Sequence, residues 1–190
     1  MIGSVMRAEP EPGAHPFFTI GHSTRPIAEF VALLSEAGVR LVIDVRTVPR
    51  SRTNPQYNRD ALPGALASFQ IGYEHLPALG GLRGANRTVS PAVNAAWTNP
   101  SFHHYADHAL TDAFRSGFAA LLALGHERRC AIMCSEAVWW RCHRRIIADY
   151  LLDAGEATFH ILRTGVVSRA RLTPEARRTP EGTLVYPAGA

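Results

Sequence analysis

The fold is decided by residues 17–45, which read FFTIGHSTRPIAEFVALLSEAGVRLVIDV. The first four residues form a short, largely apolar run, which predicts a buried strand that ends at a glycine. From Pro26 to Gly38 apolar residues recur at helical spacing, which predicts a helix that Thr24 caps and the glycine ends. The β-branched run over 39–45 predicts a second strand. A strand, a helix and a strand in this order are typical of a parallel sheet.

The rest of the chain continues this alternation. We expect further strands at 73–76, 129–133 and 157–162, and further helices at 60–69, 101–110, 112–124 and 142–154. The sequence therefore predicts an α/β fold in a single domain, with an open, mainly parallel sheet and helices on both faces in a Rossmann-like, three-layer arrangement. Around this domain at 17–162 we expect a flexible leader at 1–16 and a C-terminal extension at 163–190, which adds an edge strand at 183–186.

All 20 cationic side chains are arginines, so the chain has no lysine. This excludes enzymes that need a Schiff-base lysine or a phosphate-loop lysine, such as pyridoxal enzymes and P-loop NTPases. The formal net charge of +4 is only a weak sign of nucleic-acid binding, because a general replacement of lysine by arginine gives the same sum.

The cysteine count and the hydropathy bear on the compartment. Three cysteines in 190 residues are too few for a disulfide framework, and no stretch is typical of a signal peptide or a membrane span. We therefore expect a cytoplasmic protein with reduced thiols and no membrane partner. The sequence predicts no oligomeric state.

Unusual polar residues and glycines follow the predicted strands. In an open α/β sheet, ligands bind outside the carboxyl ends of the strands, so these residues should gather at one edge. The candidates, in chain order, are His22, Ser23, Asp44, Arg46, Arg50, Ser51, Tyr57, Gly80, Gly81, Cys134, Glu136, Cys142, His143 and Arg144.

Two carboxylates at neighbouring strand ends suggest acid–base chemistry. Asp44 and Glu136 could serve as general acid and base, or one of them could stabilise a cationic transition state. The alternative for Asp44 is an ion pair with Arg46 or Arg144 that ties the loops together.

The cysteines allow two kinds of site. Cys134 ends a strand near arginines and a helix start, which favours a nucleophilic thiolate, although free cysteines are most often buried and inert. With Cys142 and His143 it also offers a Cys2His set that zinc accepts. The Cys-x7-Cys-His spacing matches no standard zinc pattern and adjacent residues rarely bind one ion, so we expect no metal and no cofactor.

Several further candidates suit an anionic ligand with an aromatic part. Arginine forks and hydroxyl groups are the usual means of holding phosphate. For that role we expect Arg46, Arg50, Arg144, Ser23 and Ser51, with Gly80, Gly81 and Cys142 as further contacts. Tyr57 could stack on a base, and Trp139 with Trp140 could either stack on a base or pack under the loop.

Five of these motifs together resemble a known family. They are Gly21-His22-Ser23, Ile43-Asp44-Val45-Arg46 with Pro49 and Ser51, Leu79-Gly80-Gly81, Cys134-Ser135-Glu136, and Cys142-His143-Arg144. In this order they resemble the bacterial and archaeal family called domain of unknown function 488, over about 17–162. The resemblance implies a small cytoplasmic α/β protein and names no reaction. The family usually has an acidic residue and a proline before its Cys-His-Arg motif, where this chain has Ala137-Val138-Trp139-Trp140.

A fainter similarity links the chain to rhodaneses, whose second strand also ends in Asp-Val-Arg and whose catalytic cysteine ends a strand. Here the loop from Cys134 to Cys142 is longer, and it carries Glu136. A carboxylate in that loop would repel an anionic persulfide or phosphate, which counts against rhodanese or phosphatase chemistry.

Three functions remain at this point. The first is an enzyme on a nucleotide or nucleic-acid base that hydrolyses an N-glycosidic bond, in the manner of a DNA glycosylase, because that reaction needs a carboxylate but no lysine or metal. The second is a transferase or hydrolase with Cys134 or Cys142 as nucleophile and His143 or His22 as base. The third is a non-catalytic nucleic-acid-binding module that uses the arginines of 46–59 and 163–178.

Overall fold

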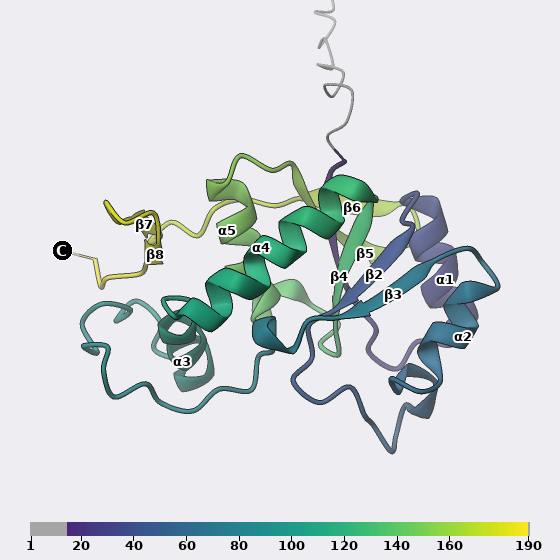
Figure 1. Cartoon of the computed structure of the whole chain (residues 1–190), viewed down its shortest axis with the longest axis horizontal. Helices are drawn as coiled ribbons and strands as arrows, with labels where there is room; N and C mark the ends of the chain where they lie inside the picture. Colours follow the sequence, from purple (N-terminus) through teal and green to yellow (C-terminus); the bar gives the residue numbers. More distant parts are fainter. Residues whose placement is uncertain (1–14, 190) are drawn as a thin grey trace, which may run out of the picture.

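The computed structural model describes residues 15–189, so nearly all of the expected leader at 1–16 lies outside the described residues. The main sheet has the order β3-β2-β4-β1-β5-β6 (Figure 1). Its strands are β1 (Phe17–Gly21), β2 (Leu41–Asp44), β3 (Gly72–His75), β4 (Cys130–Cys134), β5 (Thr158–Arg163) and β6 (Val166–Arg169). The first five are parallel and β6 runs antiparallel to β5. The expected mainly parallel α/β sheet is confirmed.

Helices cover both faces of this sheet. They are α1 (Ile27–Glu36), α2 (Leu62–Ala67), α3 (Pro100–His108), α4 (Asp112–Glu127) and α5 (Arg144–Asp153), with short 3-10 turns η1 (Pro55–Tyr57), η2 (Pro77–Leu79) and η3 (Trp139–Arg141). Figure 1 shows α1 and α2 on one side and α4 and α5 on the other. Successive strand residues point to opposite faces, so Ile132 of β4 packs in the core under α4 and α5 whereas Met133 packs in the core under α1 and α2. The three-layer prediction is therefore confirmed.

The first helix begins later than the sequence suggests. Its N-cap is Pro26, without a side-chain cap, so the prediction that Thr24 caps it is wrong. The chain makes a turn first, in which the amide of Arg25 donates to the carbonyl of His22 at 3.1 Å and Ser23 has a φ of +50°. This turn uses the residues that would otherwise form the first helical turn.

The C-terminal extension adds an edge strand, but from a different segment. β6 (Val166–Arg169) joins the main sheet, whereas the segment expected to do so forms β8 (Leu184–Val185) and pairs with β7 (Arg177–Arg178) in a separate two-stranded sheet. The reason is burial against α5. The Tyr186 hydroxyl donates to Asp149 Oδ2 at 3.0 Å, and the Leu184 amide donates to the Tyr150 hydroxyl at 3.1 Å. The extension thus shares the core of the domain. No helix among residues 15–189 has the length and apolar character needed to cross a membrane.

Candidate active site

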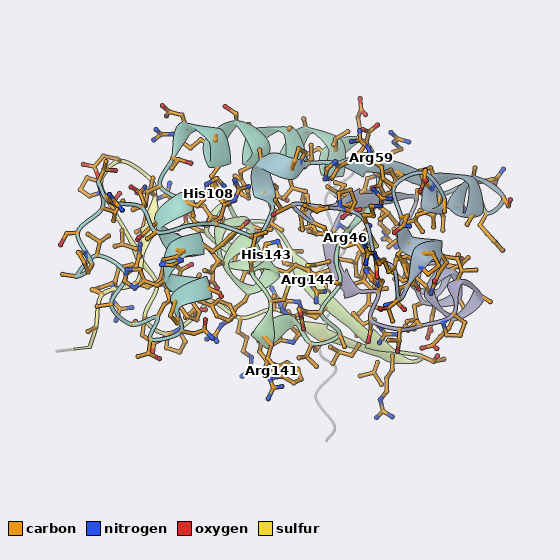
Figure 2. All side chains as sticks on the ribbon, turned by 90° about the horizontal axis from the view of Figure 1, so that it is seen from below. Arg46, Arg59, His108, Arg141, His143 and Arg144 are labelled. Carbon is orange, nitrogen blue, oxygen red and sulfur yellow. The ribbon has the colours of Figure 1, made fainter. Side chains whose placement is uncertain are left out.

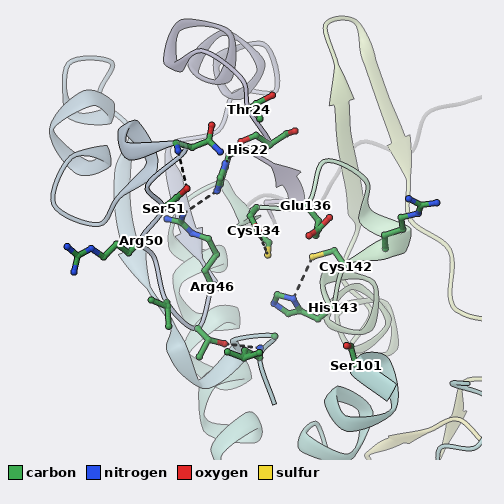
Figure 3. Close-up of a pocket in the computed structure, with 18 of the residues that line it drawn as sticks. His22, Thr24, Arg46, Arg50, Ser51, Ser101, Cys134, Glu136, Cys142 and His143 are labelled. Carbon is green, nitrogen blue, oxygen red and sulfur yellow. Dashed lines mark hydrogen bonds between the residues drawn. The ribbon is translucent and has the colours of Figure 1, made fainter. Parts of the chain in front are cut away.

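The carboxyl ends of β1, β2 and β4 open on a cleft of about 700 Å³ (Figure 3). The sequence-based candidates that line it are His22, Ser23, Arg46, Arg50, Ser51, Gly81, Cys134, Glu136, Cys142 and His143. Asp44, Tyr57, Gly80 and Arg144 are buried behind these side chains. The candidates gather at one edge of the sheet, as predicted, but four of them do not reach the cleft.

Asp44 forms a buried ion pair with Arg46, which is the alternative that the sequence left open. Arg46 donates from Nε to Asp44 Oδ1 at 2.9 Å and from Nη2 to Oδ2 at 2.6 Å. The Tyr73 hydroxyl adds a hydrogen bond to Oδ2 at 2.7 Å. Asp44 is 0% exposed, so its carboxylate is already satisfied and cannot reach a substrate. The expectation of Asp44 as a catalytic acid or base is therefore wrong.

His22 belongs to the same network. Its Nδ1 lies 2.7 Å from the Ser23 carbonyl, so Nδ1 carries the proton and Nε2 accepts from Arg46 Nη1 at 3.2 Å. Burial is the main cause that lowers the pKa of His22 to about 4, and the positive charge of Arg46 acts in the same direction. The hydrogen bond to Ser23 alone would raise this pKa. The imidazole is thus neutral, but its lone pair is occupied. This placement opposes a role for His22 as general base.

Tyr57 does not offer its ring to a ligand. It is 0% exposed, stacks on His22 with centroids 4.1 Å apart, and meets the edge of Phe30. Its carbonyl accepts from Arg46 Nη2 at 2.6 Å. The expectation that Tyr57 stacks on a base is wrong, because the ring is used to hold His22.

The other side of the cleft carries the sulfur atoms. The loop after β4 folds back through η3, where the amide of Cys142 donates to the Trp139 carbonyl at 3.1 Å. This turn places Cys142 and His143 beside Cys134, with one ligand atom from each residue within 4.8 Å of the other two. The spacing in sequence, which argued against a shared site, is thus no obstacle in space. Cys142 Sγ lies 3.6 Å from His143 Nδ1.

Arg144 is buried behind this cluster rather than exposed to a phosphate. It is 1% exposed, donates from Nε to Cys142 Sγ at 3.2 Å, and donates from Nη2 to the carbonyl of Glu136. No carboxylate among residues 15–189 forms an ion pair with it. A buried cation needs an anionic partner, and the Cys142 sulfur is the one in contact. The expectation that Arg144 binds substrate is therefore corrected.

The two cysteines titrate in opposite directions. Burial alone would raise the pKa of Cys142, but a hydrogen bond from Cys134 and the charge of Arg144 outweigh it and lower this pKa to about 6. The same hydrogen bond, with burial, raises the pKa of Cys134 to about 12. The contact between the two sulfur atoms therefore favours the charged form of Cys142 and the neutral form of Cys134.

Two glycines at this site allow close contacts, one with the backbone of Glu136 and the other with the ring of His143. A methyl group on Gly21 would lie 1.8 Å from the Glu136 carbonyl oxygen, and one on Gly81 would lie 2.3 Å from His143 Nδ1. The His143 ring is held from its other end, because Nε2 lies 3.2 Å from the Val45 carbonyl and donates to it. Gly80 is buried against Thr47, so it serves packing and not the ligand contact expected of it.

The open part of the cleft is cationic, with one acid. Glu136 is the only carboxylate among the described residues that line it, and Arg50 and Arg141 supply positive charge, whereas the charge of Arg46 is paired with Asp44. In Figure 2, Arg46, His143 and Arg144 lie towards the middle of the molecule and Arg141 lies at its rim.

Sequence reasoning missed several lining residues. Arg141 lies in the loop after β4 and could have been included on that ground, whereas nothing in the sequence marked Ser101 and Phe102 of α3. Trp139 stacks on His160 with centroids 4.3 Å apart, which confirms packing for this residue. Trp140 is 48% exposed and does not line the cleft.

Comparison with known proteins decides the family. Residues 26–151 match the family model described as domain of unknown function DUF488. The chain belongs to this family. The match confirms the resemblance drawn from the motifs, although Gly21-His22-Ser23 lies before the matched range. No curated protein and no solved structure matches the chain at a significant level.

Membership in the DUF488 family carries no reaction with it, so the chemistry must come from the cleft. In this DUF488 protein the cleft combines a carboxylate, two cysteine sulfur atoms, two imidazoles and three guanidinium groups. Such a set can bind an anion, activate water through Glu136, or attack through a sulfur atom.

Proposed function

We propose that the protein is an enzyme that hydrolyses an N-glycosidic bond in a nucleotide or in a nucleic acid, with Glu136 as the acid–base group. The observation that carries the proposal is the position of Glu136 as the single carboxylate among the described residues of a cleft lined by Arg46, Arg50 and Arg141. Because Asp44 is locked in its ion pair, the catalytic role falls to Glu136 alone.

The shape and charge of the cleft support a nucleotide-sized anion. Its volume of about 700 Å³ is within the usual range for small-molecule sites. Arginine guanidinium groups suit phosphate oxygens, and the hydroxyl groups of Ser23 and Ser51 also line the cleft. Phe102 also lines the cleft and offers an aromatic surface for a base.

In the proposed reaction Glu136 accepts a proton from a water molecule, whose oxygen forms a bond to the anomeric carbon as the bond to the base nitrogen breaks. The electron pair of that bond leaves with the base, and the base nitrogen then takes up a proton from solvent or from Glu136. Positive charge that develops on the sugar is stabilised by the nearby carboxylate. General acid–base catalysis of this kind contributes about 10²–10⁴-fold to a rate.

Release of free base tests the proposal. Nucleosides, nucleotides, and single- and double-stranded oligonucleotides with normal and modified bases are incubated with the protein, and free base is measured by chromatography. We expect turnover with at least one class, a loss of about 10²–10⁴-fold in Glu136→Gln, and nearly unchanged binding. Glu127→Gln is the matched control, because Glu127 is exposed at the end of α4 and does not line the cleft.

Two results would contradict the proposal: no free base from any substrate, or unchanged turnover in Glu136→Gln. Binding of oligonucleotides that weakens steeply with salt, without any turnover, would instead support the non-catalytic nucleic-acid-binding module.

The second candidate is a cysteine-based transferase or hydrolase, favoured by the low pKa of Cys142 at the cleft. Its thiolate would attack an electrophilic centre, and the leaving group would depart with the bonding electron pair and take up a proton from solvent. His143 Nδ1 would then act as base, accepting a proton from the water molecule or other acceptor that releases the covalent intermediate. Labelling with iodoacetamide at neutral pH decides the point. This candidate requires Cys142 to react faster than free cysteine, and it fails if Cys142 is protected. A cysteine nucleophile must stay reduced, which agrees with the cytoplasmic location expected from the sequence.

A further inference from the structure

The cluster of Cys134, Cys142 and His143 stands apart from the proposed carboxylate chemistry, because hydrolysis by Glu136 needs none of its groups. Its three ligand atoms come from two ends of one loop and meet at the floor of the cleft (Figure 3). Cys134 ends β4, and the turn at η3 returns the chain so that Cys142 and His143 face it.

The distances in this cluster are close to those of a tetrahedral site. Zinc binds sulfur at about 2.3 Å and imidazole nitrogen at about 2.0–2.1 Å, so a tetrahedral ion separates a sulfur from a nitrogen by about 3.6 Å and two sulfurs by about 3.8 Å. Cys142 Sγ and His143 Nδ1 are 3.6 Å apart. All three ligand atoms are within 4.8 Å of one another, so closing the site requires a movement of about 1 Å, within reach of a side-chain rotation at Cys134.

The surroundings of the three residues also match a metal site. A histidine that binds a metal generally donates its other ring N–H to a carbonyl or carboxylate, which fixes the tautomer. Here His143 Nε2 donates to the Val45 carbonyl at 3.2 Å, which leaves the Nδ1 lone pair facing the sulfur atoms. The Arg144 guanidinium donates to Cys142 Sγ, as outer-shell donors do to metal thiolates.

We propose that Cys134 Sγ, Cys142 Sγ and His143 Nδ1 bind one zinc-like divalent ion, with the fourth position open to the cleft. Two thiolates and an imidazole select zinc over magnesium or calcium, which prefer oxygen ligands. On binding, the Cys134 thiol releases its proton to solvent, so both sulfurs bind as thiolates. Three protein ligands and one open position are the pattern of catalytic rather than structural zinc.

An ion in this place would have a water molecule as its fourth ligand, beside Glu136 at the cleft. Zinc lowers the pKa of bound water to about 7, which would supply the nucleophile that Glu136 otherwise has to generate. This role rests on the proposed hydrolysis, whereas the binding of the ion does not.

Titration with Zn²⁺ alone tests the site. The full-length protein, purified with a phosphine reductant and stripped with a chelator, is titrated against a chromophoric chelator. We expect one ion per chain, and Co²⁺ in its place should give sulfur-to-cobalt charge-transfer and tetrahedral absorption bands. Cys134→Ser and His143→Gln should each weaken binding by more than the roughly 10–100-fold that outer-shell changes cost.

Cys130→Ala is the matched control, because Cys130 is also buried on β4 but begins the strand, about 13 Å away along it. This variant should bind as tightly as the native protein. Circular dichroism and unfolding curves show whether each variant is folded. Because Cys134→Ser keeps the contact between Arg144 and Cys142, and His143→Gln keeps a donor for the Val45 carbonyl, failure of one to fold leaves the other as the test.

The proposal is overturned if the native protein binds Zn²⁺ no more tightly than the folded variants, or if Cys130→Ala loses as much affinity as they do. Glu136→Gln separates this result from the proposed function. If that variant still binds zinc and its turnover is unchanged, Glu136 has no catalytic role but the metal site is supported. If turnover is lost and the native protein binds no zinc, the catalytic role of Glu136 is supported and the metal site is overturned.

Discussion

The two sides of the cleft use similar residue types in opposite ways. On one side His22, Asp44, Arg46 and Tyr57 satisfy one another, so that the carboxylate is fully paired and the imidazole lone pair is occupied. On the other side the sulfur atoms and His143 Nδ1 face a shared space at the cleft floor.

The difference teaches how to separate structural from chemical residues at the edge of an α/β sheet. Both groups follow neighbouring parallel strands, and both contain a histidine and a buried arginine. The first group is a closed network that holds the loops, because each partner fills the bonding capacity of the next. The second keeps lone pairs available, and it lies next to the only carboxylate among the described residues of the cleft.

The largest loss of stability should come from breaking the ion pair between Asp44 and Arg46 in the closed network. Asp44→Asn leaves Arg46 buried with no counter-charge, which should lower the free energy of unfolding by about 3–5 kcal/mol. Urea denaturation followed by circular dichroism measures it. Glu29→Gln is the control, because Glu29 is exposed on α1 where it pairs with Arg25, and the change should cost less than about 1 kcal/mol. Equal effects would show that the network is not structural.

Low pH should destabilise the side of the cleft that contains His22. Folded His22, with its pKa lowered to about 4, binds a proton only at low pH, whereas in the unfolded chain it does so near pH 6.5. Between these values the unfolded state binds more protons, so the free energy of unfolding should fall by about 2–3 kcal/mol as the pH drops from about 6.5 to 4.

His22→Asn should flatten this pH dependence. His160, whose pKa burial also lowers to about 4, contributes separately, so part of the slope should remain in that variant. Unfolding curves across the pH range measure both. An unchanged slope in His22→Asn would mean that His22 is not held neutral by the closed network.

An intermediate effect is expected where the open side is tightly packed. The methyl group of Gly81→Ala would meet His143 Nδ1, so the variant should lose about 1–3 kcal/mol of stability and displace the imidazole. Gly84→Ala in the same loop has nothing within 4 Å of the added carbon and should stay within about 0.5 kcal/mol. Thermal unfolding of the pair gives the difference. A tolerated Gly81→Ala would indicate that His143 is loosely held.

The smallest effect on stability should come from the residue with the largest proposed effect on turnover. Glu136 is exposed, so Glu136→Gln should change the free energy of unfolding by less than about 0.5 kcal/mol. A large loss of stability in this variant would place Glu136 with the closed network and break the contrast between the two sides.

The sequence was sufficient for the layout because strands and helices alternate, and because parallel strands bring their carboxyl ends to one edge. It did not predict β6, since Val166–Arg169 is short, half-buried and set among arginines. It also could not tell which candidates use up one another's hydrogen bonds, because that depends on burial and side-chain direction. The sequence therefore places Asp44 among the catalytic candidates, with an ion pair as the alternative, and Tyr57 and Arg144 among the substrate contacts, although all three are buried. The spacing of the cysteines in the sequence does not reflect their distance in space, because η3 turns the chain back on itself.

Anomalous diffraction from a crystal soaked in Zn²⁺ tests most directly the claim that one side of the cleft is closed and the other open. We predict one strong peak, within bonding distance of Cys134 Sγ, Cys142 Sγ and His143 Nδ1, and no peak at His22 and Asp44. A peak at His22 and Asp44, or a cleft without zinc at saturating concentration, would contradict it.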